Sequence, residues 1–452
     1  MFSQTLVLVA LACMVRATPV PEQVHLSFRG DFSNMAVSWI TFEDDTTVVS
    51  YGESSNNLNK VAKGTQEVWE FEGITRYVHR ALMTNLKEST RYYYQIKNRS
   101  FNFKTLAANP QSHKVCIFGD LGFYHGNSTQ SIIQNGLNGK FDFVIHVGDI
   151  SYDLHTNKGQ NGDNYMNQLE PLISTMPYMV IAGNHEDDGK NFSHYQKRFW
   201  MPDNGYQDNQ FYSFQIGPVQ YVGVSTENYG SFNYYGMEPV LTQYSWLQNE
   251  FQNANKNREN TPWLIIFQHR PFYCSNDNSA ECKSFENRLV REGWLDMPGL
   301  EGLFLQSGVD LGFYGHEHAY ERNWPIANKE YWAGDQYLHN SPAPIYVLTG
   351  SAGCHTPNAT FGNPWPWSAA RNNDYGWSIM TVANNTHIHV EQVSIDKHEA
   401  VVDEFWTSKD KDHVHNEKMR RTIGGSAKMP SMLCPVNSPA CRRTLMQINT
   451  EL

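Results

Sequence analysis

Five short apolar segments, each ending in residues that bind metal ions in proteins, constrain this chain more than any other feature. The segments occupy residues 115–122, 144–152, 179–186, 263–269 and 311–318. Buried parallel strands read as short apolar runs, and ligands collect outside the carboxyl ends of such strands in open α/β sheets. We therefore expect the polar ends of the five segments to converge in space. The candidate metal ligands in these ends are Asp120, Asp149, Tyr152, Asn184, His269, His316 and His318.

These seven candidates are enough to hold two metal ions that share one carboxylate. Two are carboxylates, three are imidazoles and Asn184 offers a carbonyl oxygen, a mixture without cysteine that suits iron, zinc or manganese. Tyr152 can offer a phenolate, a strong donor that stabilises a trivalent ion, so we expect one of the two metals to be ferric. A single Gly-Asp after a strand is usually only a turn. Five such ends in order within one domain favour a metal site over a set of turns.

The balance of charged residues argues against partners held by bulk positive charge. The 452-residue chain has a formal net charge of −11. We therefore expect neither nucleic acid nor an anionic membrane surface as a partner. An anionic substrate would have to be attracted locally, and bound metal cations would supply that attraction.

The start of the chain predicts export from the cell. Residues 1–17 hold an apolar stretch and end in Val15-Arg16-Ala17, a pattern typical of a cleaved secretory signal peptide. The stretch is too short to span a bilayer, and no later segment is long enough to do so. The alternative is a buried N-terminal helix. We expect a secreted, extracellular protein, or one in a lysosome-like compartment, with N-glycans at the acceptor sequons Asn98, Asn127, Asn191, Asn358 and Asn384.

Cysteine usage agrees with an oxidising compartment. The chain has seven cysteines, and removal of Cys13 with the signal peptide leaves an even number. Two pairs are close enough in sequence to close small loops, Cys274 with Cys282 and Cys434 with Cys441. Cys116 and Cys354 then remain, and their pairing would follow from counting alone.

Three regions follow the signal peptide. Residues 18–107 are rich in strand pattern, with turns at the short spacing of a β-sandwich and Trp39 as the expected core residue. Strand and helix patterns alternate over residues 108–405, as in α/β domains, and one helix is predicted over 165–173. Residues 406–452 form a C-terminal extension of mixed charge with the Cys434/Cys441 clip. Sandwich strands are predicted at residues 24–28, 35–41, 47–51, 77–83, 92–96 and 101–105.

The five segment ends resemble the ordered motifs of the purple acid phosphatases, a branch of the metallophosphoesterases. Those motifs are Gly-Asp-x-Gly, Gly-Asp-x-x-Tyr, Gly-Asn-His followed by Glu or Asp, an apolar run ending in His, and Gly-His-x-His, and all occur here in that order. The resemblance covers about residues 20–405. It implies a fibronectin type III-like all-β sandwich followed by an α/β metallophosphoesterase domain with four αββα layers.

The resemblance also implies a role for each ligand. The ferric ion would be bound by Asp120, Tyr152, His318 and the bridging Asp149. The divalent ion, zinc, iron or manganese, would be bound by Asn184, His269, His316 and the same bridging carboxylate.

His185, which follows the Asn ligand, is our first candidate for the general acid that protonates the leaving group, and Glu186 is the second. Plant members carry a His pair after the fourth motif, where this chain reads Cys274-Ser275-Asn276-Asp277-Asn278. The identity of the acid therefore cannot be carried over from those members.

The activity that the resemblance implies is hydrolysis of phosphate monoesters by a secreted acid phosphatase, with a metal-bound hydroxide as the nucleophile. One alternative keeps the metals and changes the substrate to a phosphodiester, such as a nucleotide or a lipid head group. A second alternative is a secreted iron-binding or interaction protein with little turnover. Rates on nitrophenyl phosphate and on its bis ester separate the two enzymes, and failure to release phosphate favours the last alternative.

Overall fold

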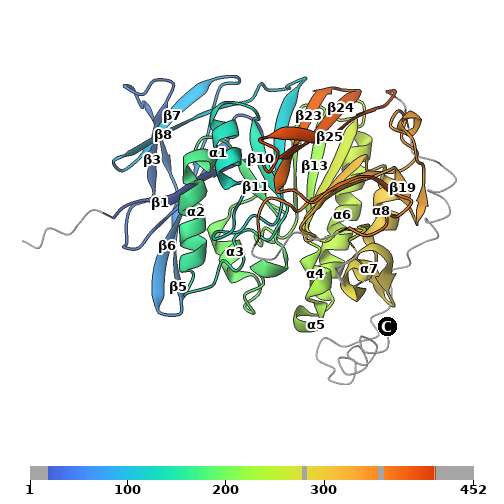
Figure 1. Ribbon diagram of the computed structural model, residues 1–452. Helices are drawn as coiled ribbons and strands as arrows, with labels where there is room; N and C mark the ends of the chain where they lie inside the picture. Colours follow the sequence, from blue (N-terminus) through green and yellow to red (C-terminus); the bar gives the residue numbers. More distant parts are fainter. Residues whose placement is uncertain (1–18, 277–281, 283, 355–360, 412, 414–452) are drawn as a thin grey trace, which may run out of the picture.

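A computed structural model of the chain describes residues 19–276, 282, 284–354, 361–411 and 413. The predicted signal peptide, the sequon Asn358 and the Cys434/Cys441 pair lie outside the described residues. Figure 1 shows a β-rich N-terminal part beside a larger part in which helices flank central strands.

The N-terminal part is a sandwich of two antiparallel four-stranded sheets, as predicted. The first sheet has the order β1 (Glu22–Ser27), β2 (Met35–Thr41), β6 (Ile74–Met83), β5 (Thr65–Phe71). The second has the order β4 (Lys60–Lys63), β3 (Val48–Gly52), β7 (Arg91–Ile96), β8 (Arg99–Lys104). Trp39 is buried in this sandwich and stacks on His79 with ring centroids 5.0 Å apart.

Strands β4 and β5 were not predicted from the sequence. Each lies at the edge of its sheet and places charged or polar side chains in the solvent, so neither shows a strong apolar run. Charged edge strands are a common protection against pairing with other chains. The same protection weakens the pattern by which a strand is recognised.

The larger part contains two mixed sheets. A six-stranded sheet has the order β11 (Tyr178–Val180), β10 (Phe143–His146), β9 (His113–Phe118), β23 (Gly376–Asn384), β24 (His387–Ser394), β25 (Ala400–Ser408), with its first three strands parallel. A seven-stranded sheet has the order β12 (Tyr212–Ile216), β13 (Val219–Val224), β14 (Trp263–Gln268), β17 (Leu311–Tyr314), β21 (Ile345–Thr349), β18 (Tyr320–Asn323), β22 (Ser368–Asn372). Strands β13, β14, β17 and β21 run parallel.

Alternation along β14 shows how the layers stack. Ile265 and Phe267 belong to a core that also contains residues of the six-stranded sheet, whereas Leu264 and Ile266 pack with the helices on the outer side. Since successive side chains of a strand point to opposite faces, the two sheets face each other and helices cover the outside, which is the αββα arrangement expected. The outer helices are α1 (Thr129–Leu137) and α2 (Gln160–Ile173) on one side and α6 (Glu238–Lys256), α7 (Phe285–Glu292) and α8 (Leu300–Ser307) on the other.

Shorter elements complete the described chain. They are η1 (Asn184–Glu186), α3 (Ser193–Arg198), α4 (Glu227–Gly230), α5 (Phe232–Tyr235), β15 (Gly293–Trp294), β16 (Met297–Pro298), β19 (Ile326–Ala327), β20 (Glu330–Tyr331) and η3 (Asp335–Tyr337). The helix predicted over 165–173 is the second half of α2, whose first turn begins at Gln160.

Buried charges join the sandwich to the larger part. Arg76 of β6 reaches α2, where its Nη2 lies 2.6 Å from Oδ2 of Asp163, and Nη1 of Arg198 from α3 lies 2.9 Å from Oδ1 of the same carboxylate. Both guanidinium groups are buried. Nε2 of Gln23 from β1 also donates to Asp163 at 2.9 Å. Because buried charges require partners, this cluster fixes α2 against the sandwich.

The described cysteines agree in part with the predicted pairing. Cys274 and Cys282 form a disulfide with Cα atoms 5.4 Å apart. Cys116 and Cys354 are both buried, and no disulfide joins them.

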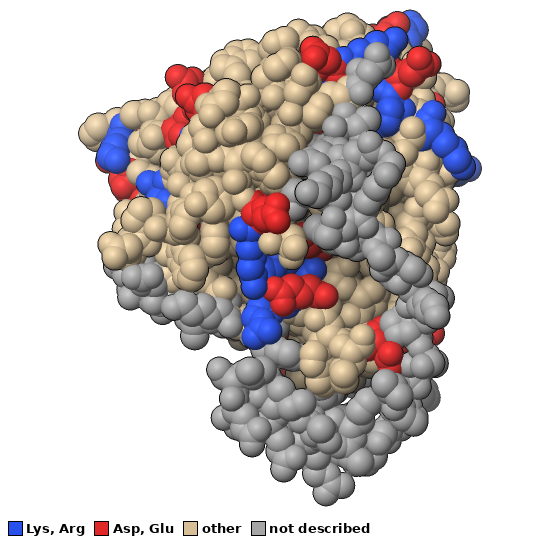
Figure 2. Space-filling model, turned by 90° about the vertical axis from the view of Figure 1, so that its right-hand side faces the viewer, with Lys and Arg blue, Asp and Glu red and all other residues tan. Residues whose placement is uncertain are grey.

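Figure 2 shows one face of the molecule, where acidic and basic side chains lie in small mixed groups. Within the described residues, none of the helices has the length and apolar character needed to cross a membrane.

Candidate metal centre

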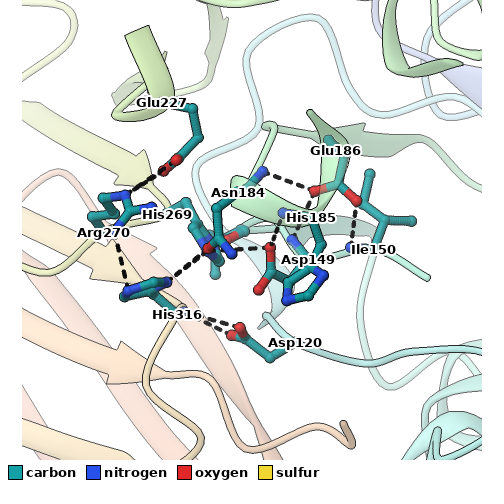
Figure 3. Close-up of polar contacts among 12 residues, drawn as sticks. Asp120, Asp149, Ile150, Asn184, His185, Glu186, Glu227, His269, Arg270 and His316 are labelled. Atoms are coloured by element: carbon teal, nitrogen blue, oxygen red, sulfur yellow. Dashed lines mark hydrogen bonds and ion pairs between the residues drawn. The ribbon is translucent and has the colours of Figure 1, made fainter. Parts of the chain in front are cut away.

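The carboxyl ends of strands from both central sheets meet at one place. Backbone bonds connect these ends: the amide of Gly119, after β9, donates to the carbonyl of Thr349 in β21, and the amide of Gly315, after β17, donates to the carbonyl of His269. All seven candidate ligands gather at this junction, and five of them are labelled in Figure 3. The convergence expected from the sequence is therefore present.

One group of donors surrounds Asn184. Its Oδ1 lies 3.0 Å from Nε2 of His269 and 2.9 Å from Nδ1 of His316. Asp149 joins the same group, since one ligand atom of Asp149, of His269 and of His316 lie within 4.8 Å of one another. Nδ1 of His269 is 2.8 Å from the carbonyl oxygen of Val147, to which it can donate. That bond leaves the lone pair of Nε2 directed into the group, as is usual for a histidine that binds a metal.

A second group contains Asp120, Asp149 and His318, again with ligand atoms within 4.8 Å of one another. The phenolic oxygen of Tyr152 lies 2.6 Å from Nε2 of His318. Asp149 belongs to both groups. Among the described candidates, its carboxylate is therefore the one side chain that the two groups share.

Burial makes the carboxylate of Asp120 unfavourable without a cation. For Asp149, burial is outweighed by the neighbouring imidazoles, His269 first, which hold its pKa below the ordinary value. Asp120 is 0% and Asp149 is 2% exposed. Burial first, and then the charge of Asp149, raise the pKa of Asp120 well above its ordinary value. Burial and the two carboxylates likewise raise the pKa of Tyr152, so this phenol ionises only beside a strongly bound cation. Two buried carboxylates, three imidazoles, a carbonyl oxygen and a phenol fit an iron centre with a second iron, zinc or manganese ion.

Four of the seven candidate ligands have left-handed backbone conformations. The φ angles are 60° at Asp120, 50° at Asp149, 54° at Tyr152 and 76° at His316. Non-glycine residues adopt this region at an energetic cost and keep it only where surrounding contacts impose it. Here both carboxylate oxygens of Asp120 accept from the amide of His316, at 3.1 and 2.9 Å. Backbone strain at these strand ends thus turns the side chains toward one point.

Glycine precedes several ligands because the main chain passes very close to them. A Cβ atom on Gly183 would lie 2.3 Å from Oδ1 of Asp149, and one on Gly148 would lie 2.5 Å from Nδ1 of His269. Gly148 also has φ of 90°. Such contacts exclude any side chain at these two positions.

Glu186, our second candidate for the general acid, has a different place. It is fully buried, and its carboxylate accepts hydrogen bonds from the amides of Asp149 at 2.9 Å, Ile150 at 2.9 Å and Gly183 at 2.8 Å (Figure 3). Both oxygens face main chain, so Glu186 cannot deliver a proton to a substrate. It holds two strand ends together instead, a role that sequence reasoning missed.

His185, the first candidate, is partly exposed beside the centre. Its Nδ1 lies 2.9 Å from Oδ1 of Asp153, and its ring lies 4.6 Å from that of Tyr152. Burial alone would lower the pKa of His185, but the hydrogen bond to Asp153 and the charges of Asp149 and Glu186 outweigh burial and raise the pKa to about 9. Asp153 was not singled out from the sequence, although it directly follows Tyr152. Its position directly after a candidate ligand is the sequence signal that could have identified it.

Arg270, which directly follows His269, forms a buried ion pair. Its Nε lies 2.9 Å from Oε1 of Glu227, and its Nη1 lies 3.3 Å from Nε2 of His316 (Figure 3). His146, one residue before Val147, pairs through Nδ1 with the hydroxyl of Tyr178 at 2.6 Å. Arg270 thus lies next to a candidate ligand, and His146 is a residue of the packed interior.

Comparison with protein families divides the chain into three consecutive matches. Residues 21–106 match the family described as Purple acid Phosphatase, N-terminal domain. Residues 113–320 match Calcineurin-like phosphoesterase, and residues 343–404 match Iron/zinc purple acid phosphatase-like protein C. The second match contains all seven candidate ligands.

Individual relatives extend over most of the chain. Acid phosphatase type 7 of Homo sapiens is 39% identical over 402 residues, which cover 85% of this chain and 90% of that protein. Purple acid phosphatase 5 of Arabidopsis thaliana is 31% identical over 407 residues, covering 85% and 93%. Among solved structures, a purple acid phosphatase from seeds of yellow lupin (Lupinus luteus) superposes with a TM-score of 0.73 at 24% identity, covering 93% of this chain and 78% of that one. The last similarity concerns the fold.

Proposed function

This chain belongs to the purple acid phosphatase family of metallophosphoesterases, and from that membership we propose that it hydrolyses phosphate monoesters with a dinuclear Fe(III)–M(II) centre. Membership makes the protein a hydrolase of the acid phosphatase type, and the family's iron/zinc character implies a centre with two metals. The assignment of ligands, metals and proton donor that follows is our proposal.

One observation carries the proposal: the Asp149 carboxylate belongs to two donor groups at once. A ferric ion would be held by Asp120, Tyr152 and His318 and a divalent ion by Asn184, His269 and His316, with the Asp149 carboxylate available to both. When bound, such a pair of cations neutralises the phosphoryl oxygens and makes a water molecule nucleophilic at acidic pH.

The protein side chains supply the remaining chemistry. His185 faces the centre and donates the proton from Nε2 to the departing alkoxide, because its Nδ1 is held by Asp153. Glu186 keeps the strand ends of Asp149 and Gly183 at a fixed separation. Arg270 is held next to His316 by its ion pair with Glu227. No covalent phosphoenzyme is required, and net inversion at phosphorus is expected.

The decisive test combines metal analysis with the visible spectrum of the purified protein. Two metals per chain, one of them iron, and a broad visible band that is lost in Tyr152→Phe support the assignment. A band that survives in Tyr152→Phe removes Tyr152 as a ligand. Hydrolysis of nitrophenyl phosphate much faster than of bis(nitrophenyl) phosphate supports a monoesterase, and the reverse order favours the phosphodiesterase.

Secretion is part of the proposal. Four predicted glycan acceptors, Asn98, Asn127, Asn191 and Asn384, are exposed, and the Cys274–Cys282 disulfide suits an oxidising compartment. Expression in an animal cell tests this directly: the protein should appear in the medium or in a lysosome-like compartment, start near residue 18 and shrink on treatment with an N-glycosidase. A cytosolic, unglycosylated product with an intact start would contradict it.

A further inference from the structure

The loop that carries Tyr152 is held by one side chain from helix α2. Nδ2 of Asn161 lies 3.0 Å from each of three consecutive carbonyl oxygens, those of Ser151, Tyr152 and Asp153. Asn161 is buried, with 3% of its surface exposed. Only a donor is stable among three carbonyls, so the amide nitrogen and not the amide oxygen occupies this position.

The three carbonyls converge because the loop has an unusual backbone. Tyr152 and Asp153 are consecutive non-glycine residues in the left-handed region, with φ of 54° and 71°. This conformation is unfavourable for both residues and brings neighbouring carbonyl dipoles together. The NH2 group of Asn161 offsets that repulsion. Without this donor, we expect the peptide groups at residues 152 and 153 to rotate, because rotation separates the carbonyl dipoles.

Rotation there would move two functional groups. The hydroxyl of Tyr152 lies 2.6 Å from Nε2 of His318, and Oδ1 of Asp153 lies 2.9 Å from Nδ1 of His185. One residue therefore contributes to the proposed ferric ligands and the next orients the proposed acid. The same amide of Asn161 contacts the backbone carbonyls of both residues.

Asn161 is itself anchored from two sides. Its own backbone amide donates to the carbonyl of Thr156 at 3.2 Å, which folds the loop back on the first turn of α2. Two residues later, Asp163 is clamped by Arg76 of the sandwich and by Arg198 of α3. The turn that presents Asn161 is thus fixed by contacts outside the metal centre.

We propose that Asn161 is a positioning residue that sets the orientation of the Tyr152 phenol and the Asp153 carboxylate at the same time. Removal of its amide should loosen the loop, displace the phenol from His318 and release His185 from its carboxylate. The spectroscopic and kinetic consequences rest on the proposed function, in which Tyr152 binds iron and His185 donates a proton. The predicted loosening of the loop does not rest on the proposed function.

The first experiment therefore uses metal-free protein. Backbone hydrogen exchange is measured by mass spectrometry in wild type, Asn161→Ala and Asn164→Ala, a matched control on the same helix whose side chain is only partly buried. Asn161→Ala should accelerate exchange in peptides covering residues 150–158 and leave the sandwich strands unchanged. Asn164→Ala should match wild type. Unchanged exchange in Asn161→Ala overturns the proposal whatever the metal content.

The second experiment uses the metal-loaded enzyme. In Asn161→Ala the visible band should shift or weaken, and kcat for nitrophenyl phosphate should fall by about tenfold to a hundredfold. Faster loop exchange with a wild-type band and rate would mean that Asn161 orders the loop without positioning either group, which also overturns the proposal. A wild-type enzyme with no band and no turnover would defeat the proposed function, while the exchange result still decides whether Asn161 holds the loop.

Two further variants guard against a failure of Asn161→Ala to fold. Asn161→Asp keeps the shape and replaces the donor by an oxygen, so its loop exchange and spectrum should change strongly. Asn161→Ser keeps a smaller donor and should lie between Asn161→Asp and wild type. Equal behaviour of the two variants would contradict a role that depends on donation.

Discussion

Oδ1 of Asp153 lies 2.9 Å from Nδ1 of His185, and this contact connects the loop after β10 with the loop after β11. The pair places a charged partner behind the imidazole that faces the centre. It also explains why the pKa of His185 is raised to about 9 in spite of partial burial.

Asp153→Asn should move the alkaline limb of kcat to lower pH. Below its pKa His185 is protonated and can act as an acid, so kcat falls as pH rises through that pKa. Loss of the Asp153 charge lowers the pKa, and the fall then begins at lower pH. The measurement is kcat for nitrophenyl phosphate against pH, with Asp203→Asn, an exposed aspartate, as the control. An unmoved limb would exclude His185 as the acid.

Glu186→Gln should destabilise the protein and weaken metal binding. The glutamine side chain has one oxygen where three backbone amides now share two, and its NH2 group would face a donor. An unsatisfied buried amide lowers the free energy of unfolding by about 1–3 kcal/mol. Metal affinity should fall by about tenfold or more. Denaturant unfolding and metal titration measure the two effects, and Glu238→Gln, an exposed residue of α6, should change neither.

Removal of the metals should make stability depend on pH in a new way. In the metal-free protein burial raises the pKa of Asp120 above its unfolded value, so the folded state binds the extra proton. Stability is then greatest below the unfolded pKa and falls as pH rises through the folded one. Bound cations remove this dependence. The difference in Tm between loaded and metal-free protein should therefore grow from pH 5 to pH 8. A constant difference would contradict cations at Asp120.

Arg76→Ala should weaken the junction between the sandwich and α2. It leaves the buried Asp163 with one of its two guanidinium partners, and breaking a buried pair lowers the free energy of unfolding by about 3–5 kcal/mol. Lys87→Ala breaks an exposed pair with Glu53 in the same sandwich and should leave Tm unchanged. Equal Tm values for the two variants would show that the buried cluster does not join the domains.

The central strands and the positions of the candidate metal ligands could be predicted because both depend on local sequence. A buried parallel strand is an uninterrupted apolar run, and the ligand is the first polar residue after it, as at Asp120 after β9 and His269 after β14. The order of the ligands along the chain is then the order of the strands. Within each sheet the convergence follows from the rule that parallel strands present their carboxyl ends at one edge. The meeting of the two sheets' edges followed from the resemblance to a known fold and not from this rule.

The supporting residues could not be predicted because their partners are distant in sequence. Arg270 meets Glu227 across 43 positions, and Arg76 meets Asp163 across 87. Neither pair produces a periodic pattern in the sequence from which it could be recognised. Asn161 and Glu186 act on backbone groups, and a side chain that binds main chain has no complementary residue type to search for.

The close approach of main chain at Gly148 and Gly183 has a consequence for how this catalyst can diversify. At these two positions the main chain lies directly against candidate ligands, and a larger residue would collide with Asp149 or His269 before it could touch a substrate. Substitution at either position therefore cannot change substrate preference without displacing a candidate ligand. A change in preference among phosphorylated compounds has to come from residues other than these two glycines.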